Sequence, residues 1–291
     1  ANSAIFAREG FVTVALAWVL MSGFGALPMV LSGAIPSYVD ALFEMVSGFT
    51  TTGASILREV ESLPRGVLFW RSFSHWVGGM GVLVFVMAIL PMSENRSMVL
   101  MRAEVPGPTA SKLVPRMRDT AKILYGTYSV MTLALIVLLL LGGMPWFDAV
   151  CHAMGTAGTG GFSVRNVGIA YYNSPYIEVV LSIFMLLFAI NFNLYYLILI
   201  RRVREALKSE ELHWFLGIVA GAVLIITACV LPLYSGLGES LRHALFQVSS
   251  IISTTGFATV DFALWPVLAQ EVLLVLMFVG ACAGSTGGGF K

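Results

Sequence analysis

Three turns rich in threonine and glycine contain the residues with the most distinctive chemistry in this chain. Each turn lies in an apolar stretch and contains no Lys, Arg, Asp or Glu. Glycine permits positive φ angles, so successive backbone carbonyl oxygens can face the same way. A row of such carbonyls replaces the hydration shell of a desolvated monovalent cation. We therefore predict that backbone carbonyls bind a monovalent cation at Thr51, Thr52, Gly53, Thr159, Gly160, Gly161, Thr254, Thr255 and Gly256.

The three turns belong to an internal repeat, which defines the architecture. Segments 39–55, 147–163 and 242–258 align without gaps, and the last glycines of the three turns coincide in this alignment. For one turn alone, a helix C-cap followed by a loop is the simpler interpretation. Three aligned copies favour a pore loop instead, because irregular backbone at membrane depth is tolerated where it lines a cavity.

The elements that must position these turns are apolar helices. Six segments have, or nearly have, the roughly 20 residues that a membrane-spanning helix needs, and they are 11–31, 67–90, 123–141, 177–200, 214–233 and 267–282. Each successive pair encloses a shorter apolar stretch, at 37–49, 146–154 and 241–252. Apolar runs of about 10–14 residues suit re-entrant segments. The pattern predicts an all-α polytopic membrane protein with repeated helix–re-entrant pore loop–helix units around a central pore.

Basic residues give the orientation and the boundaries of the units. Lys and Arg are concentrated in the connections that follow the second and fourth spans. Cytoplasmic connections carry such an excess, so the short stretches are predicted to enter the membrane from outside. We expect a first unit at 10–91, a cytoplasmic connection at 92–119, a second unit at 120–206, and a third unit at 212–291 that ends within its broken second helix.

The composition of the 291 residues agrees with a membrane protein. The chain is 58% hydrophobic and 11% charged, whereas soluble domains average about 25% charged residues. A net charge of +1 without a basic face excludes a nucleic-acid partner. No metal-ligand spacing joins the cysteines and histidines, which are Cys151, Cys229, Cys282, His75, His152, His213 and His243.

The chain resembles the Trk/Ktr/HKT superfamily of potassium transporters, and its TrkH branch in particular. The three turns, residues 76–81 (WVGGMG), residues 191–193 (NFN) and residues 284–291 (GSTGGGFK) carry the resemblance, which covers nearly the whole chain. It implies four such units around one pore, with potassium coordinated by carbonyls around each filter glycine. Glycine in every repeat goes with potassium selectivity in that family, and the three visible repeats all have it.

The resemblance also implies a gate and partners. Family members have a glycine-rich intramembrane loop beneath the filter, and the matching residues here are Gly284, Ser285, Thr286, Gly287, Gly288 and Gly289. Such residues hold a helix poorly, so a mobile plug is reasonable. Family members are homodimers in the bacterial inner membrane, with a cytosolic nucleotide-binding regulatory subunit like TrkA or KtrA. The transported ion is K⁺, and no covalently bound cofactor is expected.

The chain departs from that family's pattern in extent. We find no fourth unit, no pore arginine belonging to it, and no pair of helices before the first unit. The chain is therefore interpreted as a fragment of the pore subunit, not competent for transport on its own. Channel-like transport and coupling to sodium or protons both remain open.

Carboxylates near the start of the short helices have two compatible interpretations. Asp40 and Asp148 align in the repeat, and Glu44 lies one turn after Asp40. Helix capping, which contributes a few tenths to about 1 kcal/mol, is the simpler one. The alternative is that they raise the cation concentration at the outer mouth. Asn191 and Asn193 favour hydrogen bonds to a neighbouring helix, with a cavity lining as the alternative.

Two other function classes compete with cation transport. An intramembrane hydrolase would use Ser249, Ser250 or Ser253 with His243 or His152, and it needs nucleophile and base within hydrogen-bond reach. It has no reason to repeat its serine loop three times. A transporter of organic solutes would use broken helices at mid-membrane, but no aromatic or charged substrate contacts stand out in the turns. We predict a potassium uptake subunit and no enzyme.

Overall fold

The computed structural model describes residues 7–81 and 117–290, in which all regular elements are helices. The α-helices are α1 (Ala7–Leu31), α2 (Tyr38–Phe49), α3 (Arg65–Gly79), α6 (Met117–Leu141), α7 (Trp146–Ala157), α8 (Pro175–Ala189), α9 (Phe192–Leu199), α10 (Val203–Ala206), α11 (Glu210–Val230), α12 (Leu237–Ile252) and α13 (Val267–Val279). Short 3-10 helices are η1 (Gly168–Tyr172), η2 (Leu231–Leu233) and η3 (Phe262–Leu264).

One order of helices recurs three times: a long first helix (α1, α6, α11), a short helix (α2, α7, α12) and a second flanking helix (α3, α8, α13). Each short helix contacts both flanking helices of its own unit. Ser37 starts α2 as an N-cap whose side chain accepts a hydrogen bond from the Asp40 backbone N–H. Pro145 precedes α7, where the lack of an N–H suits a helix start. Helices α2 and α7 thus begin at local signals that the sequence contains.

Within residues 7–81 and 117–290, three helices are long and apolar enough to cross a membrane, over Phe11–Leu31, Ala121–Leu141 and Glu210–Leu233. The helix Val267–Val279 is apolar but shorter. Of the predicted span 67–90, α3 accounts for the part up to Gly79, and 82–90 lie outside the described residues. The connection at 92–119 also lies outside them, except for its last three residues.

The fourth predicted span, 177–200, has the length and hydropathy of a membrane span only when two helices are taken together, because it is broken in the middle. It divides into α8 and α9, which are bent by 89°. Ile190 is extended, and the Asn191 side chain accepts a hydrogen bond from the Asn193 N–H at 2.9 Å. Asn191 is therefore the N-cap of α9. Asn191 also makes the predicted bond to a neighbouring helix, because its Nδ2 donates to the Glu211 Oε2 of α11 at 3.5 Å.

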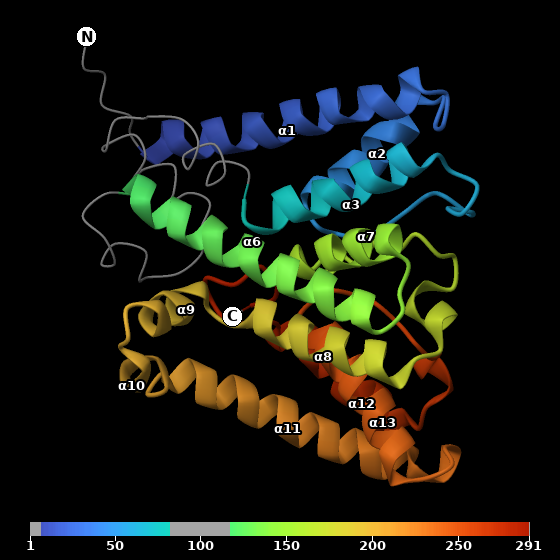
Figure 1. Cartoon of the computed structure of the whole chain (residues 1–291), viewed down its shortest axis with the longest axis vertical. Coiled ribbons are helices and arrows are strands. Elements are labelled where there is room, and N and C mark those ends of the chain that lie inside the picture. The colour runs from blue at the N-terminus through green and yellow to red at the C-terminus, as the bar shows by residue number, and fades with distance from the viewer. Residues whose placement is uncertain (1–6, 82–116, 291) are drawn as a thin grey trace.

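The helices lie side by side with α1 at one outer edge and α11 at the other, and α6, α7 and α8 lie between them (Figure 1). The loops that lead into α2, α7 and α12 lie at one end of the bundle. Helices α9 and α10 lie at the opposite end, and α10 is part of the basic stretch 201–208. The three short helices thus enter from the same end.

Successive units pack by one rule. Helix α3 of the first unit contacts α7 of the second, and α8 of the second contacts α12 of the third. Gly79 makes the first of these contacts close, because a side chain there would collide with the backbone of Gly158 at the end of α7. Gly78 does the same within the first unit, where a side chain would collide with the Phe49 carbonyl at the end of α2. Gly78 and Gly79 therefore serve helix packing.

An aromatic cluster fills the space between the first two units. Trp76 stacks on Tyr128 with ring centroids 5.3 Å apart, and the Tyr128 hydroxyl donates to the Trp76 carbonyl at 3.0 Å. Phe188 lies edge-on to Tyr128 at 5.7 Å. Such pairs add about 0.5–1.5 kcal/mol to the effect of area burial. The cluster joins α3, α6 and α8.

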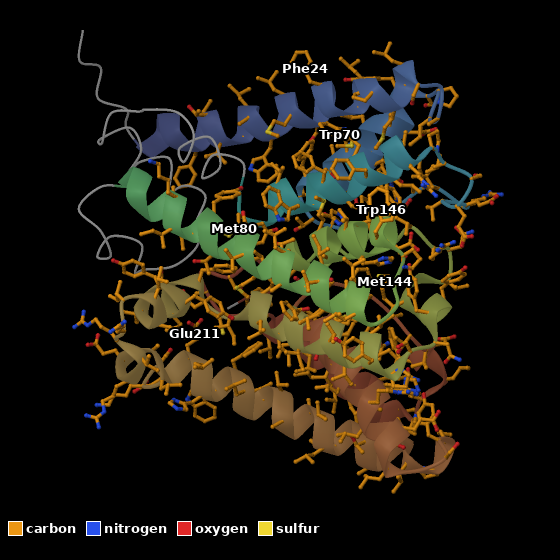
Figure 2. The ribbon with its side chains drawn as sticks, viewed as in Figure 1. Phe24, Trp70, Met80, Met144, Trp146 and Glu211 are labelled. Atoms are coloured by element: carbon orange, nitrogen blue, oxygen red, sulfur yellow. The ribbon has the colours of Figure 1, made fainter. Side chains whose placement is uncertain are left out.

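The outer helices expose apolar side chains. Phe24 on α1 is 67% exposed and points away from the bundle in Figure 2, while Leu224 on α11 and Phe278 on α13 are 68% and 58% exposed. A large apolar outer surface is expected where the solvent is lipid.

Candidate ion-selectivity filter and glycine-rich loop

The short helices end in the same hydrogen-bond pattern in every unit. In the first unit, the Thr51 N–H donates to the Gly48 carbonyl at 3.1 Å and the Thr52 N–H donates to the Ser47 carbonyl at 2.9 Å. This pair of bonds is the Schellman C-cap. The equivalent bonds run from Thr159 to Thr156, Gly160 to Gly155, Thr254 to Ile251 and Thr255 to Ser250, at 2.9–3.1 Å.

Each of these caps places a threonine in the left-handed conformation. The φ angles are 55° at Thr51, 54° at Thr159 and 61° at Thr254. Glycine is the usual residue at this position, and a β-branched residue there is a genuine outlier. Such strain clusters at functional sites. The C-cap is thus present in every copy as a part of the turn, and no longer competes with the pore-loop interpretation.

Two residues after each threonine, a glycine also has positive φ: 74° at Gly53, 78° at Gly161 and 83° at Gly256. A side chain at Gly53 would collide with the carbonyl oxygen of Gly160, and one at Gly161 would collide with that of Thr255. The turns of units one and two, and of units two and three, therefore meet backbone to backbone.

Gly256 differs from the other two glycines. A Cβ built there meets no described atom within 4 Å, and the residue is exposed. The nine residues predicted to bind a cation therefore form one arc of three turns. The arc is open beyond Gly256 in the part of the chain that the structure describes.

A buried polar side chain braces the first turn from behind. The Glu44 Oε1 atom accepts hydrogen bonds from the Ser55 hydroxyl at 2.6 Å and from the Ile56 N–H at 2.8 Å. Its Oε2 atom pairs with the Arg71 Nε at 3.0 Å, and both side chains are buried. The Arg71 guanidinium also lies over the Phe162 ring, 4.1 Å from its centroid. The first turn is thus tied to the second unit.

The second unit has a different residue at the same repeat position. The His152 Nδ1 lies 2.8 Å from the Asp148 carbonyl, which accepts only, so geometry assigns the proton to Nδ1. The Nε2 atom then accepts from the Ser163 hydroxyl at 2.9 Å. In the third unit Gln247 is buried at this position, and its Oε1 has no hydrogen-bond partner among the described residues.

These contacts correct the interpretation of two carboxylates. Glu44 is neutralised by Arg71, so it is neither a free charge at the mouth nor only a helix cap. Asp148 pairs with Arg165 at 3.0 Å and accepts from the Tyr172 hydroxyl at 2.7 Å. Burial, and then the hydrogen bond to Asp148, raise the pKa of Tyr172, so its hydroxyl stays a donor. In residues 7–81 and 117–290, no three His, Cys, Asp or Glu side chains come together as metal ligands.

The glycine-rich loop follows α13 and folds back on itself. The Ala281 N–H donates to the Gly288 carbonyl at 3.0 Å, and the Phe290 N–H donates to the Phe278 carbonyl at 3.1 Å. Gly280 has a φ of 67° at the point where α13 ends. Residues 280–289, hereafter the glycine-rich loop, include all six residues predicted to form a gate.

The loop is bonded directly to two of the turns. The Thr159 hydroxyl lies 2.9 Å from the Thr286 carbonyl oxygen and 2.7 Å from the carbonyl oxygen of the residue before Thr159, so these two acceptors share its one proton. The Thr254 hydroxyl oxygen accepts from the Gly288 N–H at 2.8 Å. These are the left-handed threonines of units two and three. The hydroxyl of Thr51 has no such bond to the loop within the described residues.

The loop also occupies the break between α8 and α9. The Cys282 N–H donates to the Ala189 carbonyl at 3.0 Å, and the Thr286 hydroxyl donates to the Phe188 carbonyl at 3.1 Å. In return, the Phe192 N–H donates to the Gly284 carbonyl at 3.0 Å. The broken helix and the loop therefore satisfy each other's backbone groups.

Glu211 also belongs to this assembly, although its sequence context does not predict it. The Glu211 Oε1 atom accepts from the Ala283 N–H at 2.6 Å, and its Oε2 atom accepts from the Asn191 Nδ2 at 3.5 Å. In the sequence, Glu211 is one of two glutamates in the first turn of a helix, where acidic residues are common. No local signal distinguishes it from Glu210.

Known proteins provide the context for this arrangement. The family profile of TrkH, described as a cation transport protein, matches residues 2–291. The Trk system potassium uptake protein TrkH of Halomonas elongata is 41% identical over 98% of the chain and 60% of its own length. TrkG of Escherichia coli K12, another Trk system potassium uptake protein, is 40% identical over 98% of the chain and 59% of its own length.

A solved structure shares the fold. The crystal structure of the potassium transporter TrkH from Vibrio parahaemolyticus aligns with a TM-score of 0.86 and 33% identity, over 99% of this chain and 60% of that one. The predicted all-α membrane fold is thereby confirmed, and the chain spans about 60% of the length of the relatives it matches. With the match to the family profile over residues 2–291, these likenesses confirm the resemblance: the chain belongs to the TrkH family of cation transport proteins.

Proposed function

We propose that the complete protein containing this chain is a potassium uptake subunit. It selects the ion with backbone carbonyls of the three Thr/Gly turns, and the residues are Thr51, Thr52, Gly53, Thr159, Gly160, Gly161, Thr254, Thr255 and Gly256. The observation that carries the proposal is the threefold repetition of one strained C-cap, with adjacent turns in backbone contact. The relatives named as potassium uptake proteins support the choice of ion.

The electrostatics suit a desolvated monovalent cation. Each turn follows the C-terminus of a short helix, where the macrodipole is equivalent to roughly half a negative charge. The turns contain no charged side chain, and the buried Glu44 behind the first turn is paired with Arg71. A potassium ion is therefore held by dipoles that stabilise it without binding it too tightly to leave.

A fourth unit completes the ring in this proposal. Each unit's second long helix packs on the next unit's short helix, and the same rule makes α13 the neighbour of a further short helix. The turn of that unit would then lie beside Gly256, where the arc is open. The greater length of the relatives leaves room for such a unit.

The glycine-rich loop is the gate in this proposal. It lies against Thr159 and Thr254, at the ends of two short helices. Ions that leave the filter would meet it before the cytoplasm. Opening requires that the loop exchange these bonds and those to Phe188 and Ala189 for other partners.

The finer assignments follow the family. We infer a homodimer in the inner membrane of a bacterium, in contact with lipid and regulated by a cytosolic nucleotide-binding subunit of the TrkA or KtrA type. The basic stretch 201–208 lies at the end of the bundle opposite the loops that precede the short helices, which supports a cytoplasmic position.

An intramembrane hydrolase is the alternative function that the hydrogen bonds of the serines and histidines test most directly. Ser250 donates to the Phe257 carbonyl, and Ser253 donates to the Ser250 carbonyl at 3.3 Å. The buried Ser249 hydroxyl has no partner among the described residues, so none of the three serines is bonded to a histidine there. His152 does contact Ser163. The equivalent Ser55 in the first unit contacts the Glu44 carboxylate, so the shared role is to brace the turn. We therefore propose no enzymatic activity and no cofactor other than the transported K⁺.

The deciding experiment is ion flux into proteoliposomes that contain the full-length gene product, its regulatory subunit and nucleotide. We expect uptake of rubidium, a potassium surrogate, to exceed uptake of sodium. Gly53→Ser should reduce that ratio, because a side chain there displaces the Gly160 carbonyl. Gly66→Ser is the matched control, since Gly66 lies in an open position at the start of α3. Absence of cation flux, or an unchanged ratio in Gly53→Ser, would contradict the proposal.

A further inference from the structure

We infer that Glu211 is a positioning residue that holds the glycine-rich loop against the filter turns and links it to the cytoplasmic end of α11. The inference rests on the proposed role of the loop as a gate. In this inference the contact between Glu211 and the loop is regulatory, and neither the repeat nor the binding of potassium requires it.

The contact joins three elements through one carboxylate. The Glu211 Oε1 atom accepts from the Ala283 N–H of the loop at 2.6 Å. The Oε2 atom accepts from the side chain of Asn191, the N-cap of α9, at 3.5 Å. Figure 2 shows Glu211 on the side of α11 that faces α9. The carboxylate therefore sits where the loop, the helix break and α11 meet.

The chemistry of this contact differs from that of the other loop contacts. The loop residues 280–289 carry no charge themselves. Their other bonds, to Thr159, Thr254, Phe188 and Ala189, use hydroxyl groups and backbone atoms. Glu211 is the one acidic side chain bonded to the loop in the described part of the chain. A charge-assisted hydrogen bond is roughly twice as strong as a neutral one, so Glu211 is the strongest single tether.

The position of Glu211 makes this tether responsive to the cytoplasmic side. Glu211 is the second residue of α11, whose N-cap is Ser209. The stretch before it exposes Arg201, Arg202, Arg204 and Lys208. A rigid helix transmits a displacement of its first turn to the side chains on that turn. Movement at 201–209 therefore pulls on Ala283, and through the loop on the Thr286–Thr159 bond.

The simpler interpretation is that Glu211 only stabilises the N-terminus of α11. Glu210 tests this directly, because it occupies the same first turn and is exposed. Interaction with the helix dipole affects both glutamates alike. A positioning role affects Glu211 alone.

The experiment compares Glu211→Gln and Glu211→Ala with Glu210→Gln in the full-length protein with its regulatory subunit. We expect rubidium flux without activating nucleotide to rise about tenfold in Glu211→Ala, equivalent to roughly 1.4 kcal/mol. The rise should be smaller in Glu211→Gln, and the rubidium-to-sodium ratio should not change. Equal effects at positions 210 and 211, or unchanged basal flux in Glu211→Ala, would overturn the inference.

Hydrogen exchange of residues 280–289 provides a second readout that does not depend on transport. Exchange should accelerate in Glu211→Gln, which keeps the shape of the side chain, and not in Glu210→Gln. Unchanged exchange in Glu211→Gln overturns the inference even if Glu211→Ala does not fold. Failure of the proposed function is a separate result, because it appears as absence of cation flux in the unmodified protein.

Discussion

At the scale of single residues, backbone geometry does not explain why threonine, rather than glycine, occupies the three left-handed positions. The left-handed conformation costs an L-residue roughly 1–2 kcal/mol, and glycine would avoid that strain at Thr51, Thr159 and Thr254. Two of the three hydroxyls bond the glycine-rich loop, which glycine cannot do. The side chain therefore contributes a function that offsets the strain in units two and three. In the first unit, the Thr51 hydroxyl makes no equivalent bond to any residue that the structure describes.

The buried Glu44–Arg71 pair gives a prediction at the same scale. Arg71→Leu leaves the Glu44 carboxylate buried without a counter-charge, which should destabilise the protein by about 3–5 kcal/mol. Adding Glu44→Gln should recover a large part of the loss, because no charge then remains buried. Thermal unfolding of the purified protein in detergent measures both changes.

Arg58 supplies the control for that prediction. It is exposed, and Arg58→Leu should stay within about 0.5 kcal/mol of the unmodified protein. If the double variant is no more stable than Arg71→Leu alone, lost packing against Phe162 is the cause rather than the unpaired charge.

At the scale of elements, the loop and the filter turns are one hydrogen-bonded assembly, which Thr159→Val tests. Valine keeps the β-branched shape but removes the donor to the buried Thr286 carbonyl, and leaving such a group unpaired costs about 1–3 kcal/mol. The loop should therefore leave its closed position more readily. We expect rubidium flux without activating nucleotide to rise by about five- to tenfold.

Thr51→Val is the matched variant, because it makes the same substitution at the same repeat position. The Thr51 hydroxyl does not bond the loop within the described residues, so the resting flux should stay near that of the unmodified protein. An equal rise in both variants would mean that the threonines act on the filter alone.

The elements also differ in whether the sequence alone predicts them. The short helices and their turns were predictable because the repeat and the Gly/Thr composition are local signals. The α8–α9 break was not, since 177–200 is an apolar run and the partner that satisfies it lies some 90 residues later. Asn191 is a common N-cap residue type, but its apolar surroundings favoured a continuous span. The role of Glu44 depended on Arg71, which is distant in sequence.

At the scale of the whole molecule, the packing rule between units predicts where a further unit would lie. Gly53→Ala and Gly161→Ala should both damage the full-length protein, because their side chains would collide with neighbouring carbonyls. Gly256 shares their positive φ but has open space in this chain. If a fourth turn lies beside it, Gly256→Ala should be as damaging as the other two, measured by yield of monodisperse protein and by rubidium flux.

A clearly milder Gly256→Ala would place the additional unit elsewhere. The positive φ alone then accounts for its effect, since alanine in this conformation is disfavoured by about 1 kcal/mol or more. Gly33→Ala measures that backbone effect by itself, because Gly33 has a φ of 71° in a loop with no atom near its Cβ position.

With the glycine-rich loop as the gate, as proposed above, the broken helix has a consequence for the water at this level of the molecule. Phe188 and Ala189 present carbonyls at the break, and the glycine-rich loop is what satisfies them. In hydrocarbon, an unsatisfied carbonyl costs several kcal/mol. The loop can therefore leave only if water forms the hydrogen bonds to these carbonyls that the loop gives up. Conduction and hydration of this level of the pore would then be the same event, and a mutation that makes the region less wettable would keep the pathway shut even with a loose loop.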